Sequence, residues 1–286
     1  MTTVTTPRSP ELDTTASQSL IALARADALR FARHPLFLFS AGVMVLSYGI
    51  GIAHQKVVGI GVEGTTVLPA FIVGVFGFVV AHRLTTSLRR SGDLTDTAPV
   101  SAQRRTLALC LACLVPMSLG ILVVLASVVF GAIWPPSLPG GHVAWFGYEP
   151  DHTIWAILIG DVVLASLGGP LLGVAVARWA PFRGSALLGM SMLVIGVVIL
   201  SMLPSPWPVV APWTIFNDEH LVNGKYQVSW VPDGISPVWW SGYAACLCGL
   251  AVLAALLRED AHRRRLFVSA AVLVALAGGF ALAAAT

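Results

Sequence analysis

Asp161 is the acidic side chain that stands deepest inside an apolar segment of this sequence. It follows Trp155 by about six residues, which is roughly 9 Å along a helix. If that segment crosses a membrane, a charged side chain there costs on the order of 2.5–3.5 kcal/mol or more, so it should face a wet cavity or a polar partner. Asp161 is therefore a candidate for lining a substrate path or carrying a proton. The alternative is a neutral or hydrogen-bonded residue that holds helices together.

The lysines exclude ATP hydrolysis by a phosphate-binding loop in this chain. Such a loop needs a Lys that follows Gly and precedes Ser or Thr. The sequence has Lys56 in Gln-Lys-Val and Lys225 in Gly-Lys-Tyr, and neither fits. We therefore expect a chain that is not an enzyme and holds no cofactor. Any ATP-driven activity would need a separate ATPase subunit that binds the ATP and Mg.

The remaining reactive side chains give no catalytic or metal-binding pattern. Reactive thiols need a cationic or ligating neighbour, and none is visible beside the cysteines, which we expect to pack as small residues. The histidines have no zinc-site spacing, so no metal site is predicted. An intramembrane serine protease would need a His beside Ser185 or Ser191, but His82 falls at the boundary of its apolar segment. The cysteines are Cys110, Cys113, Cys246 and Cys248.

The composition predicts a membrane protein. Of 286 residues, 56% are hydrophobic and 11% are charged, whereas roughly a quarter of a soluble domain is charged. The apolar residues also gather in blocks close to the ~20 residues that a helix needs to cross a bilayer. We therefore expect an all-α polytopic membrane protein. The blocks are residues 36–53, 67–81, 107–134, 154–179, 185–203, 239–257 and 266–285.

The distribution of basic residues predicts the orientation. Cytoplasmic loops of membrane proteins retain Lys and Arg. If the N-terminus is inside, only Lys56 and Lys225 fall outside. We expect a multi-pass protein of the plasma membrane with a cytoplasmic N-terminus and an external C-terminus. The arginines then expected inside are Arg25, Arg30, Arg33, Arg83, Arg89, Arg90, Arg104, Arg105, Arg178, Arg183, Arg258, Arg263, Arg264 and Arg265.

The N-terminal region divides into a tail and an amphipathic helix. Residues 1–18 are rich in Thr, Ser and Pro, which is typical of a disordered tail. From residue 19 to 33, Phe31 and other apolar residues fall on one helical arc, and Arg25, Arg30 and Arg33 fall on the opposite arc. This pattern predicts an interfacial helix on the inner membrane surface, which Pro35 ends.

Two further segments stand out between the apolar blocks. Residues 82–105 form the longest cytoplasmic connection, with a break at Gly92, an acidic turn and Ser101 as a candidate N-cap. Residues 204–238 lie outside, where an apolar stretch could re-enter the outer leaflet if protein shields its backbone. In the same segment, the pair Asn223-Gly224 predicts a hairpin turn.

The order of these elements resembles the type-2 family of ABC exporter permeases, in an actinobacterial style. The local likeness includes Leu88-Arg89-Arg90-Ser91-Gly92-Asp93-Leu94 with Thr97 to Ser101 and Arg104 to Leu107, and Ser236-Pro237-Val238-Trp239-Trp240 through Arg258. It covers most of residues 19–258, which we take as the permease domain with six spans. Residues 259–286 add a short cytoplasmic loop and a seventh C-terminal span. The family core has no counterpart of that last span.

The resemblance implies a role and partners. In that family, the first cytoplasmic loop carries a coupling helix that seats in a groove of the ATPase subunit. The chain would then be the permease of an exporter, paired with a second permease and with cytoplasmic ABC ATPases, moving a lipid, drug or peptide outward. The alternative for the loop is a solvated connection whose arginines only enforce topology. The coupling candidates are Arg89, Arg90, Gly92, Asp93, Leu94 and Asp96.

Two other classes stay open. A proton-coupled secondary carrier would use Asp161, its only deep titratable group, although such carriers normally have more polar residues within the membrane and an internal repeat. A membrane partner or sensor subunit that transports nothing is the other class. The glycines 168, 169 and 173 permit close helix approach, either at a dimer seam or within one chain. No basic face for nucleic acid is present.

Overall fold

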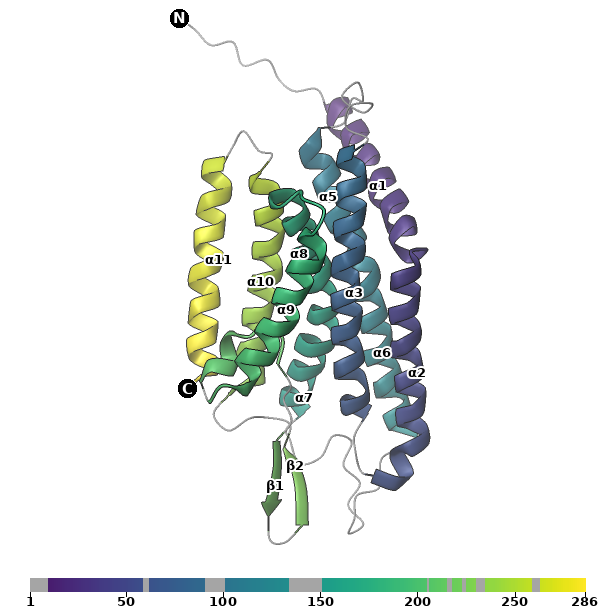
Figure 1. Ribbon diagram of the computed structural model, residues 1–286, viewed down its shortest axis with the longest axis vertical. Coiled ribbons are helices and arrows are strands. Elements are labelled where there is room, and N and C mark those ends of the chain that lie inside the picture. The colour runs from purple at the N-terminus through teal and green to yellow at the C-terminus, as the bar shows by residue number, and fades with distance from the viewer. Residues whose placement is uncertain are drawn as a thin grey trace, which may run out of the picture.

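The computed structural model describes residues 10–58, 62–90, 101–133, 151–204, 206–214, 218–222, 225–229, 235–258 and 263–286. The described part is an elongated helical bundle with a small β-hairpin at one end (Figure 1). Its helices are α1 (Pro10–Ala32), α2 (Pro35–Val58), α3 (Val62–Arg90), α5 (Ala102–Ala112), α6 (Leu114–Ile133), α7 (Asp151–Ile157), α8 (Ala165–Trp179), α9 (Ser185–Met202), α10 (Pro237–Leu257) and α11 (Arg263–Ala284). A π-helix, η1 (Leu158–Leu164), joins α7 to α8.

The predicted all-α polytopic membrane fold is confirmed. In the described residues, six helices are long and apolar enough to cross a membrane, and a seventh is counted if the bent pair α1–α2 forms one span. Each expected apolar block falls on one of these helices or on α2. The expected block at 107–134 is extended at its start, because α5 begins at Ala102, where the Arg104 N–H donates to Ser101 Oγ as predicted for an N-cap.

The centre of the bundle is the pair α3 and α8. A Cβ at Gly173 of α8 would collide with the backbone carbonyl of Phe78 in α3, and one at Gly169 would collide with that of Gly74. These glycines therefore let the two backbones pack in direct contact. The sequence left open whether they form a dimer seam, and their contacts lie within the chain. Around this pair, α10 packs on α8, and α2 packs on α3.

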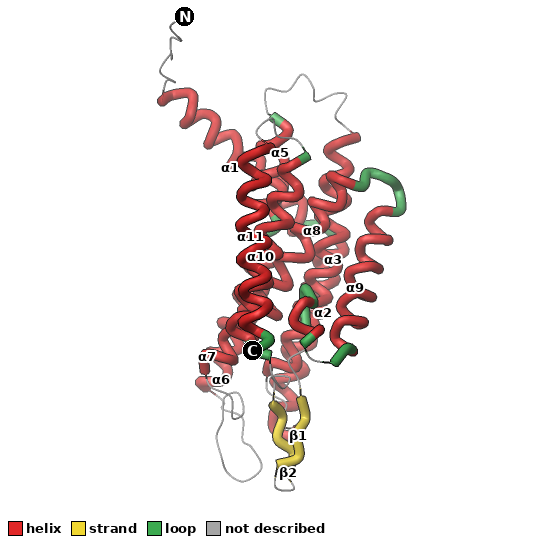
Figure 2. The backbone as a smooth tube through the Cα atoms, turned by 90° about the vertical axis from the view of Figure 1, so that its left-hand side faces the viewer, coloured by secondary structure: helices red, strands yellow, loops and turns green. Residues whose placement is uncertain are grey.

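Two spans lie at the periphery. Among its described residues, α9 buries only Ser185 and Val197, and it stands at the edge of the bundle in Figure 2. In α11, Ala277 and Ala284 are the buried residues, and the helix packs mainly along α10. Large apolar side chains of both helices are exposed, as expected for surfaces that face lipid or another membrane protein.

The N-terminal helix is longer than the sequence predicted. α1 begins at Pro10, so residues 10–18, which we expected in a disordered tail, are helical. The helix ends at Ala32, and its axis makes an angle of 65° with α2. This bend agrees with the break predicted before Pro35 and turns α1 away from the bundle axis in Figure 2.

The arginines of the described residues gather at one end of the bundle, which we call the basic end. The ends of α3, α8 and α10 lie there, together with the starts of α5, α9 and α11 (Figure 1). The opposite end carries Lys56 in the last turn of α2, and Lys225 in the hairpin of β1 (Asp218–Val222) and β2 (Lys225–Ser229). The predicted hairpin is confirmed, since Val222 pairs with Lys225 in antiparallel register.

Candidate functional site

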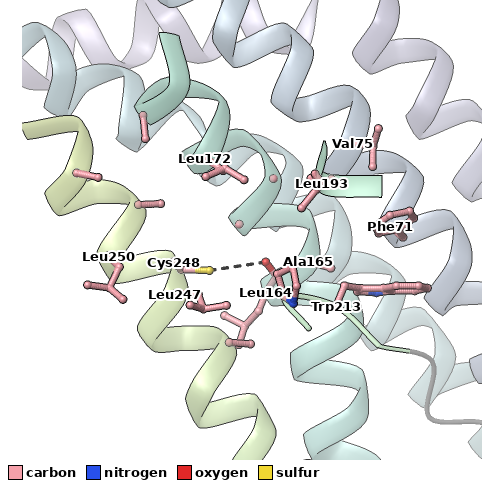
Figure 3. Close-up of a pocket in the computed structure, with 18 residues that line it drawn as sticks. Phe71, Val75, Leu164, Ala165, Leu172, Leu193, Trp213, Leu247, Cys248 and Leu250 are labelled. Atoms are coloured by element: carbon pink, nitrogen blue, oxygen red, sulfur yellow. Dashed lines mark hydrogen bonds between the residues drawn. The ribbon is translucent and has the colours of Figure 1, made fainter. Parts of the chain in front are cut away.

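An apolar cavity of about 390 Å³ lies between α3, α8, α9 and α10. Figure 3 shows its walls, which carry Phe71 and Val75 from α3, Leu172 from α8, and Leu247 from α10. The lining holds no charged side chain. Its polar groups are the Cys248 thiol, which donates to the Leu164 carbonyl at 3.9 Å, and the indole N–H of Trp213. Such a surface gives an apolar molecule contact area and little hydrogen bonding.

Small residues create this cavity. Ala165, Gly168 and Gly169 on one side and Ala251 and Ala254 on the other line the space where α8 faces α10. At Gly169 the backbone of α8 already touches that of α3, so the two helices that line this side of the cavity cannot move closer together. The cavity thus lies beside the most tightly packed pair of helices, on walls that have little freedom to collapse.

The segment after α9 closes the cavity at the hairpin end. It continues through a short 3₁₀ turn, η2 (Trp207–Val210), and then places Trp213 against the bundle. The Trp213 ring stacks on Phe71 with 4.4 Å between centroids, and its Nε1 donates to the backbone carbonyl of Asp161 at 3.3 Å. This segment, predicted to be re-entrant, is buried in protein at Val209, Ala211 and Thr214. Protein shields its backbone here, as a re-entrant segment requires.

Asp161 lies in the middle of η1 and is completely buried. The backbone N–H of Thr214 lies close enough to the Asp161 carboxyl group for a weak hydrogen bond, but neither carboxyl oxygen has a partner with good hydrogen-bond geometry among the described residues. Its neighbours Leu164 and Ala165 line the cavity, and its own carbonyl accepts from Trp213. The structure thus places Asp161 behind residues that line the cavity and gives it no charged partner among the described residues.

The π-helix around Asp161 was not predicted. Its wider turn disrupts the regular α-helical hydrogen bonding, and π-helical turns occur often at functional sites. Gly160 lies within η1, and Trp240 of α10 packs where a Cβ would stand, at 2.6 Å. The absence of a side chain at Gly160 therefore leaves room for the Trp240 ring of the neighbouring span. The sequence offers one faint signal for this π-helix. Gly160 stands directly before Asp161 within an apolar block, and a later block begins with Trp239 and Trp240.

The residues predicted for an interfacial helix lie on α1 and directly after its last residue, where the apolar Phe31 and the arginines have opposite environments. Phe31 is buried and packs edge-on against Phe37, with ring centroids 5.4 Å apart. Arg25, Arg30 and Arg33 are exposed, and Arg30 also contacts the buried Asp27 at 3.4 Å. The apolar arc of α1 faces α5 and the rest of the bundle, so protein covers at least part of the surface that we expected to lie on lipid.

The coupling candidates lie mostly outside the described residues. Gly92, Asp93, Leu94 and Asp96 belong to the stretch 91–100, which is not described. Arg89 and Arg90 are the last two residues of α3, and only their helical backbone is described. The structure therefore places the start of the predicted loop at the basic end of the bundle.

One pairing differs from what the sequence indicated. We expected no His beside Ser185, but His82 Nε2 lies 2.8 Å from Ser185 Oγ, and both residues are buried. The Ser185 Oγ also lies 2.8 Å from the Phe182 carbonyl, to which the hydroxyl donates. The His82–Ser185 pair joins α3 to the start of α9.

The cysteines are buried, as predicted for packing residues. The part of the chain that the structure describes contains no group of three or more His, Cys, Asp or Glu that could hold a metal ion.

Comparison with known proteins finds no matching family model, no similar curated protein and no similar solved structure. The description of this protein therefore rests on its structure, which is that of a polytopic helical membrane protein with an apolar cavity near a buried carboxyl group.

Proposed function

We propose that this chain is the transmembrane permease subunit of an ATP-driven exporter of the ABC type, moving a hydrophobic or amphipathic compound outward. The observation that carries this proposal is the uncharged cavity between α3, α8, α9 and α10. A cavity of this size and lining suits a lipid tail, an apolar drug or an apolar peptide side chain. It offers no counter-charge to a hydrophilic ion.

The position of α3 supports coupling to a partner ATPase. This helix lines the cavity with Phe71 and Gly74, and it ends at Arg90, where the predicted coupling loop begins. The backbones of α3 and α8 are in direct contact at Gly169 and Gly173. A movement imposed at the basic end would therefore reach the cavity wall through a rigid element. In this proposal, ATP binding draws two ATPases together, and the loop 82–105 and α1 transmit the motion.

A second permease completes the proposed assembly. The exposed apolar faces of α9 and α11 leave room for a partner chain as well as for lipid. The partner would be identical or related, and each permease would contact one cytoplasmic ATPase. The plasma membrane, an internal N-terminus and an external C-terminus belong to the same proposal, because the basic end would then face the ATPases.

Asp161 favours one alternative function. A buried carboxyl group without a hydrogen-bond partner, next to a cavity, is the kind of group that can exchange a proton during transport. The chain would then be a proton-coupled carrier that works without an ATPase. The exporter is preferred because no acidic, basic or histidine side chain lines the cavity to receive that proton.

Affinity purification in a mild detergent tests the exporter proposal. The tagged chain should retain an ABC ATPase in stoichiometric amount, identified by mass spectrometry. The double variant Asp93→Ala, Leu94→Ala should lose it, since these residues are the predicted contacts. A matched variant, Glu259→Ala, Asp260→Ala, removes acidic charge from the connection between α10 and α11 and should retain it. Absence of any ATPase from the wild-type preparation would favour the carrier.

A further inference from the structure

A second hollow, which we call the basic cleft, lies at the basic end between α3 and the turn that joins α8 to α9. Its volume is about 800 Å³, and it is separate from the apolar cavity, with which it shares no lining residue. The walls come from α2, α3, the α8–α9 turn and the first turns of α9. The proposed transport cycle assigns no ligand to this cleft, although His82, Arg83, Thr86 and Ser87 of its lining fall within the loop 82–105.

The polar rim of the basic cleft is positively charged. Arg83 of α3 and Arg183 of the α8–α9 turn both line it, and both side chains are exposed. Neither rim arginine makes an ion pair with an acidic side chain among the described residues, whereas Arg30 pairs with Asp27. The hydroxyl-bearing Thr86 and Ser87 line the same rim. Two guanidinium groups facing one cleft form a site for a phosphate group.

The rest of the cleft is apolar. On α3, Val79 lies about one turn before Arg83 and Phe76 about two turns before it, and Leu187 and Met190 lie on the facing side of α9. The lining therefore changes from charged to apolar along α3 from the basic end toward the middle of the bundle. That gradient matches a molecule with an anionic head and a hydrocarbon tail, and a free anion would use only the rim.

Local structure holds the two arginines in place. The His82–Ser185 contact joins the residue before Arg83 to the first residue of α9. The His82 ring also stacks on Phe78, with 6.3 Å between ring centroids. In addition, α9 begins beside Arg183 with Gly184 at its N-cap, which supplies no side-chain cap. The positive end of the α9 dipole therefore adds to the field of the two guanidinium groups.

We propose that the basic cleft binds one anionic phospholipid of the leaflet at the basic end, with the phosphate between Arg83 and Arg183 and an acyl chain along Phe76 and Met190. The lipid would fill the space between α3 and the peripheral helix α9. This proposal does not depend on which energy source drives transport.

Native mass spectrometry of the purified full chain tests the site. Phosphatidylglycerol should remain bound at lower added concentration than phosphatidylcholine. The variant Arg83→Gln, Arg183→Gln should raise the apparent Kd for phosphatidylglycerol by at least about tenfold. The matched variant Arg264→Gln, Arg265→Gln removes the same charge from the same end of the bundle, outside the cleft, and should bind as the wild type does.

Three results would overturn the proposal. Equal retention of the two lipids would remove the need for an anionic head, and equal losses in both double variants would show attraction by overall charge alone. Displacement of the lipid by millimolar inorganic phosphate would identify a free-anion site.

A measurement on the unaltered protein keeps the test valid if the cleft variant fails to fold. Phosphatidylglycerol with a photoreactive group on its acyl chain should cross-link to residues 76–87 of α3 or 181–190 of the α8–α9 region. Cross-links found only elsewhere, for instance along α11, would exclude the cleft as the binding site.

Discussion

At the scale of single residues, Asp161 stands out because its polar carboxyl group lies in a fully buried, apolar environment. Its carboxyl group is buried without a hydrogen-bond partner among the described residues, inside a helix that otherwise carries apolar side chains. An unsatisfied buried polar group destabilises a fold by about 1–3 kcal/mol. This cost makes Asp161 the residue whose substitution best separates a role in transport from a role in helix packing.

The substitution Asp161→Asn separates these roles. The amide cannot ionise, so we expect the free energy of unfolding to rise by about 1 kcal/mol or more, measured as a higher melting temperature in detergent. ATP-dependent transport should persist in an exporter. Asp27→Asn is the control, because it removes another buried carboxyl group that contacts Arg30 and does not line the cavity. Loss of transport in Asp161→Asn with stability unchanged would support the proton carrier.

Filling the cavity should block cargo without unfolding the chain. Ala251 lines the cavity from α10, whereas Ala245 on the same helix is exposed. The variant Ala251→Phe should therefore weaken binding of an apolar fluorescent probe by at least about tenfold, while Ala245→Phe leaves it unchanged. The measurement is a probe titration followed by fluorescence. Equal binding by both variants would contradict a cargo site at this cavity.

Sequence reasoning at this scale found the buried acid but not its surroundings. The depth of Asp161 follows from its distance to the end of an apolar block, which is local information. Its contact with Trp213 joins residues that are far apart in the chain, and the Ser185–His82 pair does the same. No local spacing encodes such contacts, and a His at a segment boundary gives no sign of the helix that it faces.

At the scale of elements, the central feature is the direct backbone contact between α3 and α8. The substitution Gly173→Ala places a methyl group against the Phe78 carbonyl, a backbone atom that cannot move aside. We expect the free energy of unfolding to fall by about 1–3 kcal/mol, seen as a lower melting temperature in detergent.

The matched control for that change is Gly196→Ala in α9, where an added Cβ meets nothing within 4 Å. Alanine favours helix over glycine, so this variant should keep or slightly raise the melting temperature. If both variants melt alike, the close α3–α8 approach does not stabilise the fold.

The spans themselves were predictable because their signal is local. A block of about twenty apolar residues must form a helix in a bilayer, where every backbone group needs an internal partner. The π-helix at Leu158–Leu164 and the early start of α1 at Pro10 were not predicted. The first lies where Gly160 packs against Trp240 of a different span, a contact that no local spacing encodes. The second overrides a Thr- and Ser-rich composition that taken alone favours disorder.

At the scale of the whole molecule, the separation of charge between the two ends predicts orientation. In a variant whose four cysteines are replaced by alanine, a new cysteine at Lys225 lies in the hairpin and one at Arg264 lies at the basic end. A membrane-impermeant maleimide should label Lys225→Cys in intact cells and Arg264→Cys only after permeabilisation. The reverse pattern would place the basic end outside and would exclude contact with cytoplasmic ATPases.

The most direct test of the central claim is transport by the purified complex in proteoliposomes, with fluorescent apolar and amphipathic compounds as cargo. The account predicts movement that requires ATP hydrolysis, is insensitive to a protonophore, and falls at least about tenfold in Ala251→Phe but not in Ala245→Phe. Movement driven by an imposed pH gradient without ATP, and abolished by Asp161→Asn, would contradict it.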